Sequence, residues 1–310
     1  MSGVSVRTTL ERVMVEIVPY EPRHLSALVA LADAHLALVP PHDARMIAPA
    51  LEMVVRQYHR LWLHHYPEDA DIPTHHRALV ALEAGEPVGL AIVRWSSDDE
   101  SGHVAFLLAE PSMPEAADRL IEEATAMLSA QACATIEAGD RCPIGLGWFG
   151  LPTTWTHLIG AYERAGFACV DGWAIMTGRT DAVPIEPPRP AKEMIHVLLT
   201  EHPDRREWRI EFFHDEENVG ECDAWGVPPH LDSCPGFGDW ITIEWIGVAE
   251  EFRRRGLAFW LMVKQMHYHL RAGRHYVMLW TGPDNLPARS LYRRLGFDDG
   301  PETRVFRKVL

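Results

Sequence analysis

The sequence predicts an α/β chain of two tandem domains, in each of which strands and helices alternate. Three observations predict this architecture. The 310 residues exceed what a single hydrophobic core comfortably organises. Strand-like and helix-like apolar periodicities alternate along the chain. The two halves also repeat each other, because Val88-Gly89 recurs as Val219-Gly220 and AYERAGF recurs as LYRRLGF, both after about 130 residues.

The first half carries both kinds of pattern in an alternating order. Apolar and β-branched runs predict strands over Val13–Val18, Arg77–Glu83, Val88–Trp95, His103–Leu108, Cys142–Phe149 and Cys169–Met176. Helical spacing predicts helices over Pro22–Leu38 and Ala44–His65, one that Pro114 opens, and one that Thr153 or Thr154 caps and that ends in AYERAGF. The AGEP segment between two of the strands is typical of a hairpin turn.

A proline-rich stretch at 181–193 predicts a semi-rigid linker, so we expect domains over 1–180 and 194–310. In the second half we expect a strand over 194–200, a hairpin over 208–225 with its turn at Asp215–Asn218, and a closing strand over 302–309. A proline- and glycine-containing loop fills 227–239. The second domain has no room for the two helices that the first carries between its first strand and its hairpin.

Composition narrows the classes of function. A formal charge of −15 argues against nucleic acid, whose binding needs a basic face, and is compatible with a cationic partner, although solubility explains it more simply. No apolar run reaches the length of a membrane span, and the N-terminus lacks a signal-type core, so we expect a cytoplasmic protein. The cysteines form no CxxC pair, as is typical of reduced thiols: Cys133, Cys142, Cys169, Cys222 and Cys234. Several histidines suggest a metal, but none has HExxH-like spacing, so no metal site is expected: His59, His64, His65, His75 and His76.

The stretch from Ile241 to Phe297 carries the chemistry. It reads as a strand, an Arg/Gly loop that opens a helix, a second strand and a short helix that ends at glycine. The loop residues are Arg253, Arg254, Arg255, Gly256, Leu257 and Ala258. A helix N-terminus presents unpaired N–H groups and partial positive charge, so this loop suits a diphosphate. Gly256 allows close approach of a ligand, and the arginines add charge-assisted hydrogen bonds.

Together with the later segment from Asn285 to Phe297, this loop resembles the GNAT acyltransferase superfamily, whose pattern joins a splayed strand, [QR]xxGx[GA] and N…A…LYxxxGF. The resemblance covers most of the second domain and, more weakly, the first, and it implies that each domain is a central mixed, mostly antiparallel sheet flanked by helices. It implies that acetyl-CoA is the acyl donor, with its diphosphate on Arg253–Ala258 and its pantetheine arm along Ile246, Gly247 and Val248. Asn285 would bond the pantetheine or the strand end. Glu250 stands where the family commonly has proline.

The resemblance also implies a proton donor and a base. Tyr292 would be the general acid for the leaving thiolate, since a phenol with a pKa near ~10 suits a thiolate. Glu244 would be the base that deprotonates the attacking ammonium. These two residues and Asn285 each have a structural alternative. Tyr292 is then a packing aromatic, Glu244 a solvated strand residue and Asn285 a helix cap. Other residues remain open as the base: Asp239, Asp223, Glu211 and His230.

The first half fails the same comparison. Met113-Pro114-Glu115-Ala116 falls where the arginines and Gly256 stand, and Trp155 falls on Asn285. We therefore expect a degenerate copy that no longer binds CoA, that keeps Tyr162 for structure and that shapes the acceptor pocket. The expected function is transfer of an acetyl group from acetyl-CoA to a primary amine of a small molecule, by a monomer or homodimer. The alternatives are a non-catalytic CoA-binding regulatory module and a protein N-acetyltransferase.

Overall fold

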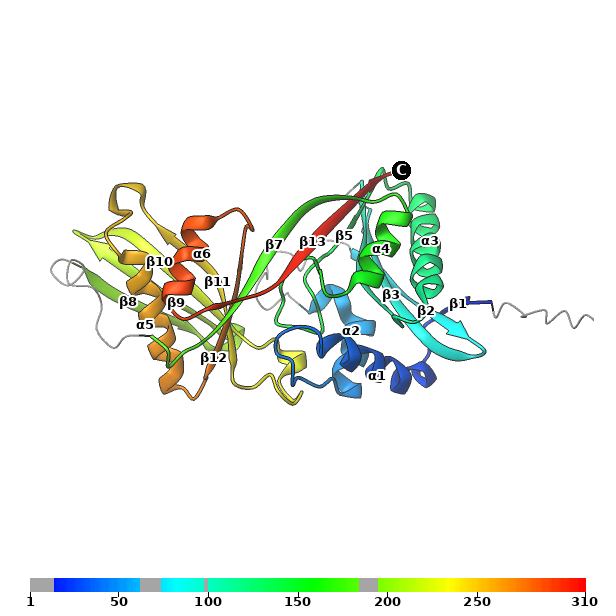
Figure 1. Ribbon diagram of the computed structural model, residues 1–310, viewed down its shortest axis with the longest axis horizontal. Helices are drawn as coiled ribbons and strands as arrows, with labels where there is room; N and C mark the ends of the chain where they lie inside the picture. Colours follow the sequence, from blue (N-terminus) through cyan, green and yellow to red (C-terminus); the bar gives the residue numbers. More distant parts are fainter. Residues whose placement is uncertain (1–13, 62–73, 98–99, 184–194) are drawn as a thin grey trace, which may run out of the picture.

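A computed structural model describes residues 14–61, 74–97, 100–183 and 195–310. They form one continuous 13-stranded sheet that extends through two lobes, with the N-terminal half at the right of Figure 1 and the C-terminal half at the left. Among the described strands, only the neighbours β4–β5 and β11–β12 are parallel. The predicted fold class, a mixed and mostly antiparallel sheet flanked by helices, is confirmed.

The two halves present the same order of elements, except that the first half also contains the helices α1 and α2 and the short strand β6. The first half consists of β1 (Glu16–Pro19), α1 (Leu25–Leu36), α2 (Ala48–Gln57), β2 (Thr74–Glu83), β3 (Glu86–Ser96), β4 (Ser101–Ala109), α3 (Pro114–Ala130), β5 (Thr135–Ala138), β6 (Leu151–Pro152), α4 (Thr156–Arg164) and β7 (Ala168–Arg179). The second half consists of β8 (His196–His202), β9 (Glu207–His214), β10 (Glu217–Gly226), β11 (Trp240–Val248), α5 (Leu257–Arg271), β12 (Tyr276–Thr281), α6 (Leu286–Arg294) and β13 (Asp298–Val309). As expected, the second half has no helical pair between β8 and β9, where only a three-residue 3₁₀ turn lies.

Both predicted hairpins form through two-residue turns. Ala84 and Gly85 connect β2 to β3 with φ values of 50° and 86°, and Asp215 and Glu216 connect β9 to β10 with φ values of 49° and 70°. Two consecutive left-handed residues match the right-handed twist of the flanking strands. The shared turn geometry fits the internal repeat.

Two predicted elements differ from the structure. The strand expected over Cys142–Phe149 is wrong, because these residues form turns, and the parallel partner of β4 is Thr135–Ala138 instead. An apolar run cannot by itself distinguish a buried strand from a buried loop. The helix expected over Ala44–His65 is shorter, Ala48–Gln57 followed by a 3₁₀ turn, and its expected end at His65 lies outside the described residues. Parts of the linker at 181–193 and of the strand expected from Val13 also lie outside them.

The two halves exchange their last strands. β7, from the first half, pairs with β12 of the second, from Tyr276↔Arg179 to Thr281↔Ala174. β13, from the second half, pairs with β5 of the first, from Phe306↔Ala138 to Val309↔Thr135. β7 and β13 also pair with each other, and Figure 1 shows them running side by side from one lobe to the other. Each half therefore completes its sheet with a strand from the other.

Side chains follow the same exchange into two hydrophobic cores. Phe306 of β13 is fully buried in the first core with Trp148 and Tyr162. Met176 of β7 is fully buried in the second with Phe212 and the apolar side of α5. Burial of such large side chains is the main contribution to stability, so neither core is complete without the other half. No helix among the described residues is long and apolar enough to cross a membrane.

Candidate active site

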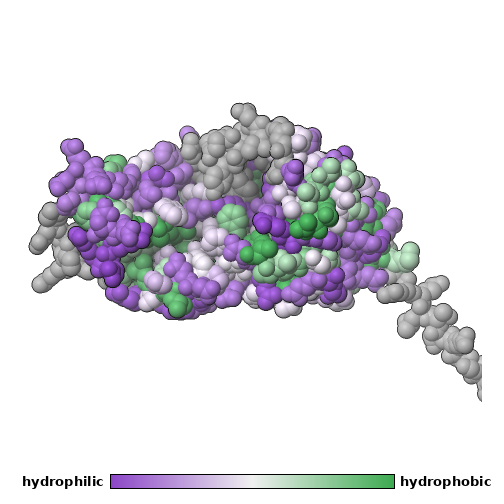
Figure 2. Space-filling model, turned by 90° about the horizontal axis from the view of Figure 1, so that it is seen from above, coloured by the Kyte–Doolittle hydropathy of each residue, from purple (hydrophilic) through white to green (hydrophobic). Residues whose placement is uncertain are grey.

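A cleft of about 1580 Å³ opens where β11 and β12 separate. The two strands pair only from Trp240↔Tyr276 to Ile243↔Leu279. Beyond that point β11 continues beside β10, whereas β12 continues beside β7. Figure 2 shows green apolar residues between purple polar ones on the C-terminal half, seen from above. One edge of β11 is left without a strand neighbour and faces the cleft.

All twelve residues predicted from the sequence for catalysis and cofactor binding line this one cleft. They are Glu244, Ile246, Gly247, Val248, Arg253, Arg254, Arg255, Gly256, Leu257, Ala258, Asn285 and Tyr292. The structure brings them together from the end of β11, the start of α5 and both ends of α6.

The edge of β11 presents its main chain to the cleft. Ile246, Gly247 and Val248 pair on one side with Cys222, Glu221 and Gly220 of β10. In an extended strand, main-chain groups point alternately to the two sides, so the groups that do not face β10 face the cleft. This edge can hydrogen-bond an extended chain of amides.

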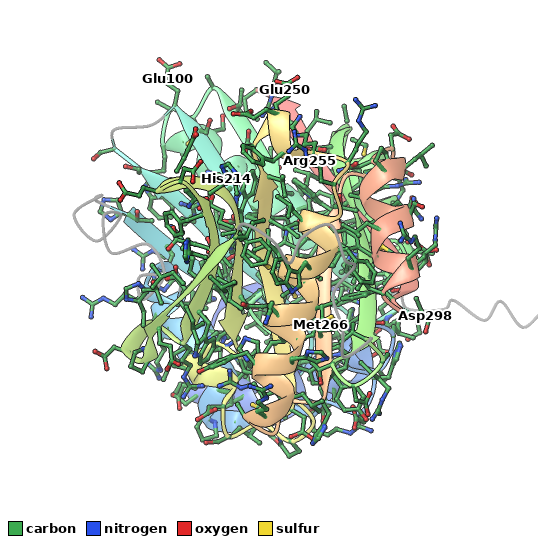
Figure 3. All side chains as sticks on the ribbon, turned by 90° about the vertical axis from the view of Figure 1, so that its left-hand side faces the viewer. Glu100, His214, Glu250, Arg255, Met266 and Asp298 are labelled. Atoms are coloured by element: carbon green, nitrogen blue, oxygen red, sulfur yellow. The ribbon has the colours of Figure 1, made fainter. Side chains whose placement is uncertain are left out.

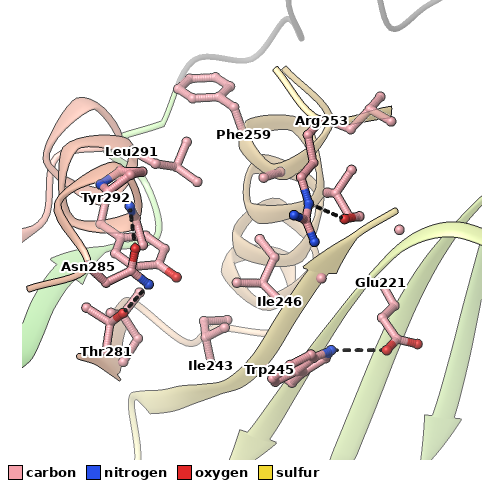
Figure 4. Close-up of a pocket in the computed structure, with 18 of the residues that line it drawn as sticks. Glu221, Ile243, Trp245, Ile246, Arg253, Phe259, Thr281, Asn285, Leu291 and Tyr292 are labelled. Atoms are coloured by element: carbon pink, nitrogen blue, oxygen red, sulfur yellow. Dashed lines mark hydrogen bonds between the residues drawn. The ribbon is translucent and has the colours of Figure 1, made fainter. Parts of the chain in front are cut away.

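The Arg/Gly loop ends in a left-handed turn at the start of α5. Arg254 has φ 61° and Gly256 has φ 83°. Arg253 Nε donates to Val248 O at 3.1 Å (Figure 4). Arg255 Nη2 donates to Glu251 O at 2.9 Å, and these two hydrogen bonds hold the loop. Among the described residues, no main-chain acceptor pairs with the N–H groups from 254 to 259; the first helical bond is Trp260 N to Gly256 O.

These free N–H groups lie at the N-terminus of a 15-residue helix, where the helix dipole places partial positive charge. Figure 3 shows Glu250 and Arg255 at the top of the C-terminal half, above Met266 further along α5. Glu250, which stands in place of the family's usual proline, begins a 3₁₀ turn, Glu250–Phe252, and the loop still forms. The geometry is that of an anion site for phosphate oxygens.

Tyr292 lies in the last turn of α6 and reaches the cleft (Figure 4). Its side chain is 5% exposed, and burial raises the pKa of its phenol above the ordinary value. The described residues offer its hydroxyl no hydrogen bond. It therefore combines a packed ring with a protonated hydroxyl in the cleft, so the packing alternative and the donor role are compatible.

Asn285 caps α6, as the structural alternative proposed. Its Oδ1 accepts from Ala288 N at 3.3 Å, and its Nδ2 donates to Thr281 Oγ1 at 3.2 Å (Figure 4). The cap holds the start of α6 against the end of β12. Asn285 thus fixes the wall of the cleft, whether or not it contacts a cofactor.

Glu244 is the extra residue of a β-bulge in β11. Asp223 pairs with Trp245 and Ala224 with Ile243, so Glu244 has no opposite residue on β10. Its carboxylate binds the guanidinium of Arg141, from the first half, in an ion pair whose side chains are 16% and 7% exposed. Glu244 is therefore a half-buried partner of the other half, and the solvated-strand alternative does not describe it.

The other residues considered as a base do not line the cleft. Asp223 accepts two hydrogen bonds from Arg209, at 2.7 and 2.8 Å, and Glu211 accepts one from Asn218 at 2.9 Å. His230 Nε2 lies 2.7 Å from Pro143 O, and burial lowers its pKa to about 4. Asp239 is exposed at the start of β11. Of the five carboxylates and histidines considered, only Glu244 lies in the cleft.

The sequence interpretation missed the aromatic residues of the cleft. Phe149 and Trp173 of the first half line it together with Trp280 and the 56% exposed Trp245. Phe259 and Arg294 line the end near the Arg/Gly loop, with the guanidinium 5.6 Å from the ring centroid. The only available signal for the first group was the unusual number of tryptophans, 11 in the chain.

The equivalent groove of the first half is filled. A cavity of only about 20 Å³ remains between β4 and the segment 139–151, and Trp155 and Tyr162 line it. Tyr162 is 1% exposed and stacks on Phe306 of β13, with ring centroids 5.4 Å apart. Met113 and Pro114 begin α3 where the second half has its arginine loop. This groove has no space for a nucleotide cofactor.

The histidines do not form a metal cluster in the part of the chain that the structure describes. His75 stacks on Trp95 with ring centroids 5.5 Å apart. His64, His65 and the side chain of His59 lie outside the described residues.

Comparison with known proteins agrees with the geometry. Residues 178–297 match the acetyltransferase (GNAT) family. An uncharacterised N-acetyltransferase of Methanocaldococcus jannaschii is 32% identical over 109 residues, which cover 31% of this chain and 47% of that protein. A mycothiol acetyltransferase of Pseudarthrobacter chlorophenolicus is 44% identical over 71 residues, which cover 23% of this chain and 21% of that protein. These matches thus span less than half the length of either relative.

Two solved structures are similar over almost the whole chain. A tandem GNAT protein from the clavulanic acid biosynthesis pathway superposes with a TM-score of 0.62 at 14% identity, covering 96% of this chain and 98% of that one. A GCN5-related N-acetyltransferase from Sphaerobacter thermophilus gives a TM-score of 0.65 at 16% identity, covering 95% of each chain. Residues 178–297 therefore carry a domain of the GNAT acetyltransferase family, and the chain as a whole has the fold of tandem GNAT proteins.

Proposed function

We propose that this protein transfers an acetyl group from acetyl-CoA to a primary amine of a small molecule, by direct attack within a ternary complex. The observation that carries the proposal is the single cleft in which the arginine loop, the free edge of β11, the Tyr292 hydroxyl and the Glu244 carboxylate meet. The second half would be the working half, over 194–310, with the first half, over 1–180, as a copy that does not bind CoA.

Each part of the cleft has a part of acetyl-CoA that fits it. The N–H groups at the start of α5 and the side chains of Arg253–Arg255 would hold the diphosphate. The edge Ile246–Val248 would hydrogen-bond the amides of the pantetheine arm, as an added strand does. Phe259 and Arg294 suit the adenosine and its phosphate, because a ring can stack on a base and a guanidinium can bind a phosphate.

The reaction needs only proton transfers beside the attack. The amine nitrogen forms a bond to the thioester carbon as the carbon–sulfur bond breaks. Glu244 takes the proton from the ammonium, directly or through a water, and Tyr292 gives its proton to the departing thiolate. Burial, which raises the pKa of Tyr292, keeps this proton donor in its acid form at neutral pH. No covalent intermediate on the enzyme is required.

The acceptor would enter from the side where the two halves meet. Phe149 and Trp173 belong to the first half, and both line the cleft beside Glu244. Since the second half lacks the helical pair between its first two strands, residues of the first half stand on the acceptor side in its place. The similarity to a mycothiol acetyltransferase spans only 71 residues and does not by itself extend that acceptor to this chain.

The location of the protein remains a prediction. All five cysteines are free, and four of them are buried. Free thiols suit a reducing compartment, so we propose the cytoplasm.

The proposal is tested by calorimetric titration with acetyl-CoA, followed by a screen of amines for release of free CoA thiol. We expect amine-dependent thiol release and one acetyl-CoA per chain, because within the described ranges the open cleft lies in the second half and the equivalent groove of the first half is filled. Small amines and peptide N-termini are compared in the same screen, so a protein acceptor would show itself as a preference for peptides. Binding without thiol release from any amine would favour a regulatory CoA-binding module, and absence of binding would refute the proposal.

A further inference from the structure

Arg141 reaches from the half without a CoA cleft to the carboxylate of Glu244. It lies in the segment between β5 and β6, and its side chain is 7% exposed. Nη2 donates to Glu244 Oε1, and Nη1 donates to Glu244 Oε2 at 3.4 Å. Two nitrogens therefore face two oxygens, the arrangement that fixes a carboxylate in orientation as well as in position.

The main chain beneath Arg141 is held in place. Arg141 forms an antiparallel bridge with Phe149, and Cys142 N donates to Trp148 O at 2.9 Å. Nη1 also donates to Gly147 O at 3.1 Å, within the same turn. The guanidinium is thus tied to the segment from which it projects, and its plane is set before it meets Glu244.

Aromatic rings from three different elements surround the same guanidinium. Its carbon lies 4.3 Å from the ring centroid of Phe149, 4.9 Å from that of Trp225 on β10 and 5.7 Å from that of Trp280 on β12. Rings at these distances attract a cation, most strongly where water is displaced. A lysine ammonium would keep the charge but could not donate from two coplanar nitrogens.

Glu244 needs such a partner because of where it lies. It is the bulged residue of β11, next to the point where β11 and β12 separate, so its side chain departs from the regular alternation of the strand. Bulges often re-aim a side chain beside an active site. Here the bulge directs the carboxylate towards the first half, and Arg141 receives it.

We propose that Arg141 is a positioning residue of the acetyl transfer, supplied by the half that binds no CoA, and that it acts by holding the Glu244 carboxylate in place to accept the amine proton. This inference rests on the proposed function. It gives the first half a part in the reaction beyond walling the acceptor side.

The test is a kinetic comparison of Arg141→Met, Arg141→Lys and Glu244→Gln with the unaltered chain. We expect Arg141→Met to lower kcat about a hundredfold, in the range that a positioned base contributes, with an unchanged Kd for acetyl-CoA. Arg141→Lys should recover part of kcat, because it restores the charge without the two-nitrogen geometry. Arg209→Met is the matched control, since Arg209 forms a comparable pair with Asp223 on the same sheet but outside the cleft.

Two further measurements separate positioning from a merely structural tie between the halves. The double variant Arg141→Met/Glu244→Gln should be no slower than Glu244→Gln alone, because Arg141 acts through Glu244. Added guanidinium ion should raise kcat of Arg141→Ala, because the ring-lined space left by the side chain accepts a planar cation. Ammonium at equal ionic strength is the control for that rescue.

The outcomes are distinct. Losses that multiply in the double variant, or a folded Arg141→Met chain with full kcat, would overturn the inference and leave the proposed function standing. An unaltered chain that binds acetyl-CoA but releases no thiol with any amine would overturn both. A lowered melting temperature for Arg209→Met, with kcat retained, would show that loss of a pair on this sheet does not by itself slow the reaction.

Discussion

Replacing Tyr292 with phenylalanine removes a single oxygen atom from the cleft and keeps the ring. The ring is 5% exposed and lies against Phe297, with centroids 5.9 Å apart, so the packing of α6 is retained. The hydroxyl has no hydrogen bond within the described part of the chain, so no partner is left unsatisfied. We expect the free energy of unfolding to change by less than about 1 kcal/mol.

The effect on catalysis should be much larger. A general acid contributes on the order of 10²-fold or more, which corresponds to about 2.7 kcal/mol of activation free energy. We therefore expect kcat to fall by about 10²-fold in Tyr292→Phe, with the Kd for acetyl-CoA unchanged. In the unaltered chain, burial raises the pKa of this phenol, so kcat should not decline through its ionisation at neutral or mildly alkaline pH.

The assay is thiol release at saturating amine, with calorimetry for acetyl-CoA and thermal unfolding for stability. Tyr162→Phe is the matched control, because Tyr162 occupies the equivalent place in the first half, where the groove is filled. It should leave kcat and acetyl-CoA affinity unchanged. Full kcat in a folded Tyr292→Phe chain would refute the reasoning, and an equal loss in both variants would attribute the effect to packing.

Three further predictions follow from the structure. Gly256→Ala should weaken acetyl-CoA binding by about tenfold in calorimetry, since a side chain at φ 83° costs about 1–2 kcal/mol and would shift the loop. Gly273→Ala is the control: its φ is 78° and it lies at the open end of α5, so this variant should lose a similar amount of stability but no affinity for acetyl-CoA. Trp173→Leu should raise KM for the amine and leave KM for acetyl-CoA unchanged, because Trp173 lines the cleft on the side that the proposal gives to the acceptor. The opposite pattern would contradict this placement of the acceptor. Stability should fall on acidification, because burial lowers the pKa of His35 to about 4 and of His269 to about 3 from an ordinary 6.5. Between the folded and the unfolded pKa, the unfolded chain binds protons that the folded chain does not. Urea unfolding should therefore show a loss of up to about 3 kcal/mol in the free energy of unfolding from His35 alone as the pH falls from about 6.5 to 4. A free energy of unfolding that does not change with pH in this range would contradict the prediction.

The local chemistry of the second half was determined by the sequence alone. The loop Arg253–Ala258 and the segment Asn285–Phe297 are short, continuous motifs, and each takes its conformation from its own residues. Gly256 adopts a left-handed φ that opens α5, and a helix N-terminus of this kind suits an anion. For the same reason the hairpin turns at Ala84–Gly85 and Asp215–Glu216, and the helices that follow Pro114 and Asn285, were predictable.

Only the tertiary structure decided what surrounds that chemistry. The periodicity of β7 and β13 shows which of their residues are apolar. A strand forms the same hydrogen bonds with a neighbouring strand from either half, so the sequence of β7 and β13 does not reveal the exchange. The segment Cys142–Phe149, expected as a strand, instead forms the turn that carries Arg141 to Glu244. That contact joins residues that are 103 positions apart in the sequence, and its strength depends on aromatic rings from three separate elements around the guanidinium. The sequence therefore determined where an anion site forms, and the packing of the two halves decided which residues of the first half face the same cleft.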